Sequence, residues 1–156
     1  KGQKTLMTMY KDYIELVNYF KALPDTVTDL KSATVGSDEE DLNSQNSRIR
    51  YPHLRVDTPE ILYPNDDSEM VTRYSFQIFV LTNEPKKTNE EENKALSAME
   101  KIVRKIIKQL WADADSGLFD MAPADKEADA VRRWSGDNVF GWWFRVRIDL
   151  WTDECG

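Results

Sequence analysis

Two stretches of the chain repeat apolar residues at steps of three and four, the spacing of an amphipathic helix. The first runs from Thr5 to about Leu23 and ends before Pro24, because proline does not continue a helix. The second begins at Thr88, which forms a capping box with Glu91, and continues to about Trp111. The apolar positions are Leu6, Met9, Tyr13, Leu16, Val17 and Phe20 in the first, and Leu96, Met99, Ile102, Val103, Ile106 and Leu110 in the second. Both stretches are predicted to be helices.

Two other stretches alternate apolar and polar residues, which predicts strands. They span Val71 to Leu81 and Val139 to Trp151, and shorter extended pieces are expected at 49–56 and 60–63. The elements therefore predict an α+β fold in the order α-β-β-α-β, with an antiparallel sheet covered on one face by two helices. Residues 1–156 are expected to form one domain, since no linker separates two cores.

Two segments interrupt this pattern. Residues 34–47 are acidic and polar, and they predict a long solvated loop or docking arm. Its acidic residues are Asp38, Glu39, Glu40 and Asp41, which we take as candidate interface residues. Leu118 to Val131 has acids and alanines without a clean period, so no element is predicted there.

Composition narrows the functional classes. The chain has 156 residues and a formal net charge of −7, which disfavours binding to nucleic acid through phosphate contacts. One cysteine, Cys155, excludes an internal disulfide and a cysteine-based zinc site, and favours a reducing compartment. No apolar run approaches the roughly 20 residues of a membrane helix. We therefore expect no membrane association.

Candidate chemistry is sparse in the sequence. The one histidine, His53, lacks the neighbours of a zinc site, although it could act as a general base with carboxylates. The acid pairs Asp113 with Asp115 and Asp125 with Asp129 have spacings expected by chance, and glycine-rich phosphate loops are missing. We therefore expect no enzyme, no cofactor and no metal; an enzyme using His53 is the least favoured hypothesis.

The final strand suggests an interaction surface. Its core face is predicted to carry Trp142, Phe144, Val146, Ile148 and Leu150. Its opposite face carries Trp143, Arg145, Arg147 and Trp151, and tryptophan and arginine are enriched at interface hot spots. The alternative is that residues 118–131 cover this face within the same chain.

Two stretches carry a family resemblance. Residues 51–59, leading to 74–80, and the segment Asp137-Asn138-Val139-Phe140-Gly141-Trp142-Trp143-Phe144-Arg145-Val146 resemble phage tail terminator and head–tail joining (neck) proteins. In those proteins a helix, a hairpin, a helix and a late strand recur in this order. The acidic 38–41 loop departs from the short hairpin expected there.

The resemblance implies a function without catalysis. Such a subunit forms a ring, commonly a homohexamer, that caps the tail tube and contacts the neck or connector proteins. It would reside in the virion tail or neck after assembly in the bacterial host cytoplasm. A net charge of −7 is compatible with DNA passing the lumen without specific binding. The alternative hypothesis is a monomeric acidic binding module, such as an inhibitor or immunity-like protein, for a basic partner.

Overall fold

The N-terminal helical region is two short helices rather than one long one. The computed structural model describes residues 9–36, 49–64, 71–83, 88–122, 127–134 and 139–151. Helix α1 (Tyr13–Lys21) begins at Asp12, whose side chain accepts a hydrogen bond from the Glu15 amide at 3.1 Å. The prediction of a helix from Thr5 is wrong for residues 9–12, which are not helical. Pro24 occupies the first turn of the four-residue helix α2 (Leu23–Thr26), a position that proline favours.

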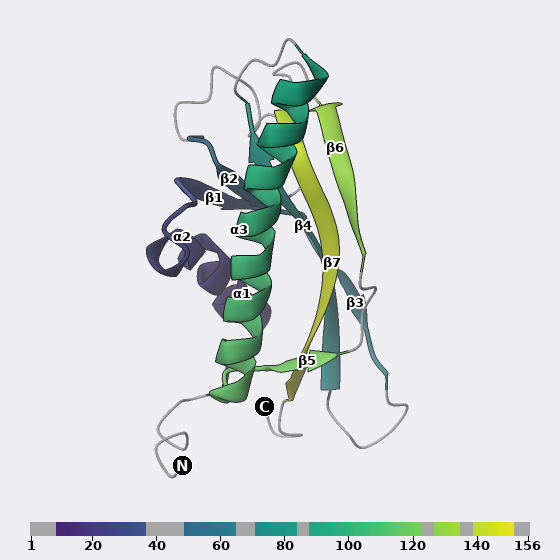
Figure 1. Ribbon diagram of the computed structural model, residues 1–156. Coiled ribbons are helices and arrows are strands. Elements are labelled where there is room, and N and C mark those ends of the chain that lie inside the picture. Colours follow the sequence, from purple (N-terminus) through teal and green to yellow (C-terminus); the bar gives the residue numbers. More distant parts are fainter. Residues whose placement is uncertain are drawn as a thin grey trace.

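The long helix α3 (Asn89–Asp115) confirms the predicted capping box. The Glu91 amide donates to Thr88 Oγ1 at 3.1 Å, and the Thr88 amide donates to Glu91 Oε1 at 3.2 Å. The stripe that faces the sheet is buried, and α3 lies across β7 (Figure 1). The buried apolar residues of α3 are Ala95, Leu96, Met99, Ile102, Val103, Ile106 and Leu110.

In the described part of the chain, seven strands form one sheet. In chain order they are β1 (Ser32–Val35), β2 (His53–Val56), β3 (Glu60–Leu62), β4 (Val71–Thr82), β5 (Asp120–Ala122), β6 (Ala128–Trp134) and β7 (Val139–Trp151). The spatial order is β1-β2-β4-β7-β5; β3 also pairs with β4, and β6 also pairs with β7. The long strands β4 and β7 form the centre, paired from Val71 opposite Trp151 to Thr82 opposite Phe140.

The predicted antiparallel sheet with two covering helices in the order α-β-β-α-β is wrong, although the broad α+β description still fits. The sheet is mixed, because β1 runs parallel to β2, and it is covered by one long helix and a short bent helical segment. Thr34 and Val35, assigned to the acidic loop, belong to β1. Strand β5 and the first four residues of β6 lie in the segment 118–131, for which no element was predicted.

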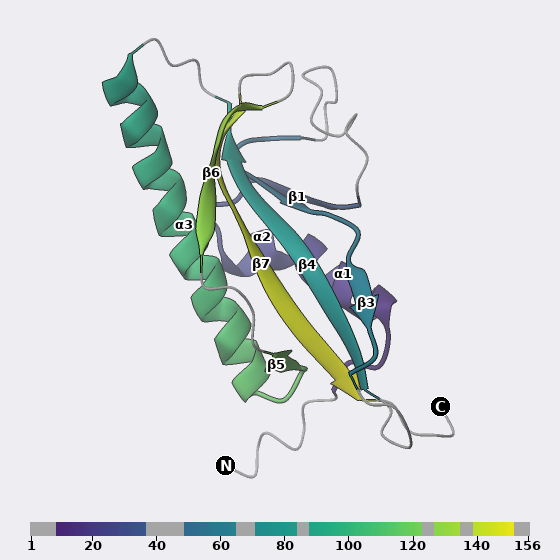
Figure 2. The same ribbon diagram turned by 90° about the vertical axis from the view of Figure 1, so that its right-hand side faces the viewer.

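The core lies between the helices and one face of the sheet. It contains the predicted inward residues of both long strands, including Phe76 and Phe144. The ring of Phe20 from α1 packs edge-on against Phe76, with centroids 4.9 Å apart. In Figure 2, α1 and α2 lie behind β4 and β7, so the opposite face of the sheet is turned to the viewer. We call it the helix-free face.

Candidate interaction surface

The helix-free face is formed by the alternate residues of β4 and β7. Neighbouring pairs across the two strands are Phe79 with Trp143, Gln77 with Arg145, Ser75 with Arg147, and Arg73 with Asp149. Because strand side chains alternate between faces, these residues all point away from the core helices. The structure thus brings three predicted interface residues, Trp143, Arg145 and Arg147, into one row.

The upper end of this row is apolar and mostly buried. Trp143 stacks on Phe79 with ring centroids 6.2 Å apart, and both belong with Val131 and Val139 to a second, smaller apolar cluster. Val131 comes from β6, which pairs beside β7 rather than lying over it. The alternative was that residues 118–131 cover this face. The described strands of that segment, β5 and β6, lie beside β7 in the sheet and not over it. Trp143 is half-buried and stabilises this face of its own chain.

Arginines occupy the middle of the face. Arg55 from β2 forms an ion pair with Asp57 at 2.8 Å, and its guanidinium lies 5.9 Å from the centre of the Phe79 ring. Arg145 and Arg147 are half-buried. The Nε atom of Arg145 is buried without a hydrogen-bond partner in the described part of the chain.

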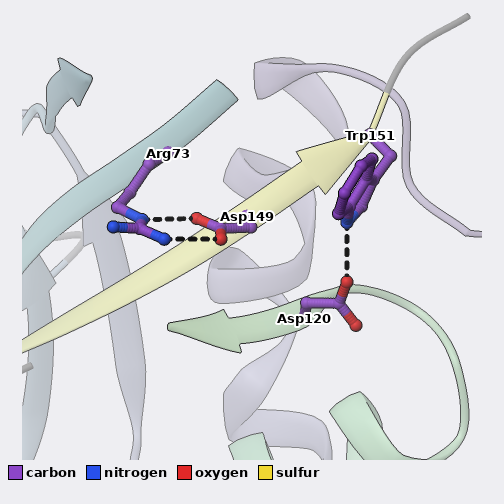
Figure 3. Close-up of polar contacts among 4 residues, drawn as sticks. All are labelled: Arg73, Asp120, Asp149 and Trp151. Atoms are coloured by element: carbon purple, nitrogen blue, oxygen red, sulfur yellow. Dashed lines mark hydrogen bonds and ion pairs between the residues drawn. The ribbon is translucent and has the colours of Figure 1, made fainter. Parts of the chain in front are cut away.

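Two polar contacts fix the other end of the row, as Figure 3 shows. Arg73 on β4 donates Nε and Nη2 to the two carboxylate oxygens of Asp149 on β7, at 2.8 and 3.0 Å. The hydrogen bond to Asp149 raises the pKa of Arg73. Trp151 donates Nε1 to Asp120 of β5 at 2.7 Å, and the residue remains 45% exposed.

The Arg73–Asp149 pair predicts a measurable loss of stability. Asp149→Asn removes a bidentate, charge-assisted contact whose carboxylate is largely buried, so the free energy of unfolding is expected to fall by about 2 kcal/mol. Urea unfolding followed by tryptophan fluorescence measures it. Glu90→Gln is the matched control, because Glu90 and Lys94 form an exposed pair at 3.6 Å, for which a change below about 0.5 kcal/mol is expected. Equal midpoints for both variants would contradict the assigned role of Asp149.

His53 is fully buried between β1 and β2. Its Nδ1 lies 2.7 Å from Ser32 Oγ and its Nε2 lies 3.0 Å from Thr34 Oγ1. Burial, followed by the charge of Arg55, lowers the pKa of His53 to about 4. Both ring nitrogens are engaged by hydroxyl groups of the neighbouring strand. The structure therefore places His53 as a residue that joins two strands, and it gives no support to the hypothesis of His53 as a general base.

The edge strand β3 exposes a group of apolar side chains that sequence reasoning missed. Ile61, Leu62 and the following Tyr63 are 47%, 45% and 70% exposed. β3 pairs with β4 along one side, and in the described part of the chain its other side pairs with nothing. The signal in the sequence was the run Ile61-Leu62-Tyr63 between Pro59 and Pro64. Such a run on an open strand edge is a typical site for pairing with another chain.

A groove of about 510 Å³ between the N-terminal helices and α3 was also missed. Tyr19 donates its hydroxyl proton to Asp113 at 2.6 Å, and Glu15 and Asp25 line the same groove. Burial, followed by the hydrogen bond to Asp113, raises the pKa of Tyr19. Its walls come from residues about 90 positions apart, which no local pattern could bring together.

The remaining predicted residues are outside the surfaces above. Asp38, Glu39, Glu40, Asp41 and Cys155 lie outside the described residues. Within the described ranges, no set of three or more His, Cys, Asp or Glu residues is arranged to hold a metal ion. No helix of the described part is long and apolar enough to cross a membrane.

Comparison of the chain with protein-family models, with curated proteins and with solved structures found no match.

Proposed function

We propose that the protein is a structural subunit that works by assembling with copies of itself into a ring, as phage tail terminator and neck proteins do. The observation that carries the proposal is the edge of β3, which pairs with no further strand among the described residues and exposes Ile61, Leu62 and Tyr63. Covering this edge would bury apolar surface and satisfy backbone groups together. The half-buried Arg145 on the adjoining face adds a guanidinium group of the kind enriched at protein interfaces.

In this function the ring caps the tail tube and contacts the neck or connector proteins in the virion. This function requires contact surfaces for neighbouring proteins and no chemical reaction, so no catalytic residue or cofactor is assigned. The net charge of −7 favours a lumen from which DNA phosphates are repelled. Assembly would take place in the cytoplasm of a bacterial host.

Light scattering across a concentration series tests the proposal. The expected result is a discrete assembly of about six times 18.2 kDa. Leu62→Lys is expected to return the mass to that of a monomer, because it places a charge on the proposed contact. Ile14→Lys is the control, since Ile14 is an exposed apolar residue on α1, away from the β3 edge, and its replacement should leave the assembly intact. A protein that stays monomeric up to millimolar concentration and does not bind tail-tube ends would overturn the proposal.

The acidic groove favours a second candidate, a monomeric module for a basic partner. Glu15, Asp25 and Asp113 line it beside Tyr10 and Tyr19, a combination that suits a lysine or arginine side chain. The same scattering series separates the candidates. A monomer that forms a 1:1 complex with a lysine-rich peptide favours the module, and self-assembly favours the ring.

A further inference from the structure

In the described part of the chain, two strands on each side of the sheet have an edge without a strand partner: β1 and β3 on the β4 side, and β5 and β6 on the β7 side. Of these, β3 lies beside β4 and β6 lies beside β7, on opposite sides of the sheet (Figure 2). On β6, Ala128, Asp129 and Ala130 are all exposed. A chain with two different open edges can associate head to tail, each copy offering one edge to each neighbour.

The directions of the two edge strands suit such pairing. β3 is antiparallel to β4, and β4 is antiparallel to β7. β6 is antiparallel to β7, so β6 runs in the direction of β4 and opposite to β3. A neighbouring copy placed beside the first with its sheet facing the same way therefore meets β3 with an antiparallel β6. The antiparallel pair is the slightly more stable of the two kinds.

Side-chain size also matches across these edges. Ile61 lies opposite Tyr74 on the helix side of the sheet, and on β6 the residues on that side are Ala128 and Ala130, opposite Phe144 and Trp142. Across a strand pair, side chains on the same face are neighbours. The large side chain of Ile61 would thus meet two small alanines, which leave space for it.

The two edges are offset along the strands. Residues 128–131 of β6 lie beside 141–144 of β7, which in turn pair with 78–81 of β4, whereas β3 lies beside residues 73–75. Joining β3 to β6 therefore shifts each copy along the strand direction relative to the last. Closing a sheet into a ring requires such a stagger and the strand tilt that accompanies it.

We propose that β3 of one copy pairs in antiparallel fashion with β6 of the next copy, so that the sheet continues from subunit to subunit around the ring. This inference rests on the proposed ring function and names the surfaces that build it. The occupant of the β3 edge is a second copy of this chain, and the contact is heterologous.

Disulfide cross-linking tests the pairing. In a Cys155→Ser background, Ile61→Cys is mixed with Ala128→Cys or with Ala130→Cys, because a two-residue change of register keeps the same face. Mild oxidation is expected to give a covalent dimer of about twice 18.2 kDa in at least one mixture, and none in any single variant alone. Lys94→Cys on exposed α3 replaces the β6 cysteine in the control mixture, which should not cross-link with Ile61→Cys.

Three outcomes would count against the inference, and they separate it from the proposed function. A dimer formed by Ile61→Cys alone would show β3 meeting β3, a two-fold contact that overturns the heterologous pairing. A ring mass by light scattering with no mixed cross-link would overturn the β3–β6 contact and leave the ring function standing. A monomer at every concentration that gives no cross-link and does not bind tail-tube ends would overturn both.

Discussion

Gly141→Ala is expected to lower the free energy of unfolding by about 3 kcal/mol or more, a large part of the total stability of a domain this size. A Cβ atom at position 141 would lie 1.8 Å from the carbonyl oxygen of Val80 and 2.9 Å from its carbonyl carbon. Both are backbone atoms of the central strand β4, so no side chain can turn away to make room. Glycine within a strand marks such a close approach of two backbones.

Gly141 lies at a point of the sheet where a backbone shift would affect two neighbouring strands. Gly141 pairs with Leu81 of β4 on one side and with Val131 of β6 on the other. A shift of β7 at this point would disturb the central ladder and also displace the β6 edge proposed as an interface. Gly141→Ala is therefore expected to weaken assembly as well as folding.

Urea unfolding of Gly141→Ala and Gly117→Ala measures this effect. Gly117 has a positive φ of 96° but no atom within 4 Å of an added Cβ, so its replacement carries only conformational strain, about 1–2 kcal/mol. The difference between the two variants isolates the steric contribution. If Gly141→Ala unfolded at the same midpoint as Gly117→Ala, the close approach of β7 to β4 would be wrong.

The elements that the sequence predicted correctly are those in which apolar residues recur regularly over many positions, because one side of the element is buried along its length. Helix α3 buries one stripe over 27 residues, and β4 and β7 bury one face over 12 and 13 residues. Their registers also place Trp143, Arg145 and Arg147 on the opposite face, so part of the candidate surface followed from alternation alone.

The strands that were not predicted lack such a regular apolar pattern, for physical reasons. In β6, Ala128 to Ala130 are exposed on both faces, so no apolar alternation is required there. β1 is four residues long, and its side chains Ser32 and Thr34 serve His53 rather than the apolar core. Its parallel partner β2 begins 18 residues after β1 ends, and such pairing leaves no local signal. The sequence also could not show that β3 lies at an edge, because whether a strand is central or peripheral depends on the pairing of the whole sheet.

His53 links the stability of this fold to pH, through a histidine that stays neutral when folded. Its pKa is about 4 in the folded protein and about 6.5 in the unfolded chain, because burial disfavours the charged ring and Arg55 lies nearby. Between these values the unfolded chain binds a proton that the folded protein does not. Lowering the pH from about 6.5 to about 4 therefore favours unfolding, and below about 4 this contribution no longer changes.

The difference of roughly 2.5 pKa units corresponds to about 3 kcal/mol of stability lost over that interval. His53→Gln keeps a polar side chain but cannot titrate, so its stability should change less with pH between 6.5 and 4. Carboxylates titrate in both proteins, and subtracting the two pH profiles leaves the contribution of His53. The expected difference profile rises by about 3 kcal/mol from pH 4 to pH 6.5 and is flat above it.

Because His53 is the only histidine, its ring resonances in proton NMR report its pKa directly. The expected titration midpoint is about 4 in the folded protein, with the ring neutral throughout the physiological range. A midpoint near 6.5 would mean that the ring reaches solvent and that the Ser32 and Thr34 hydroxyls do not hold it. The β1–β2 junction, and with it the side of the sheet that leads into β3, would then be looser than its hydrogen bonds imply, because those hydroxyls are the side-chain contacts through which His53 joins the two strands.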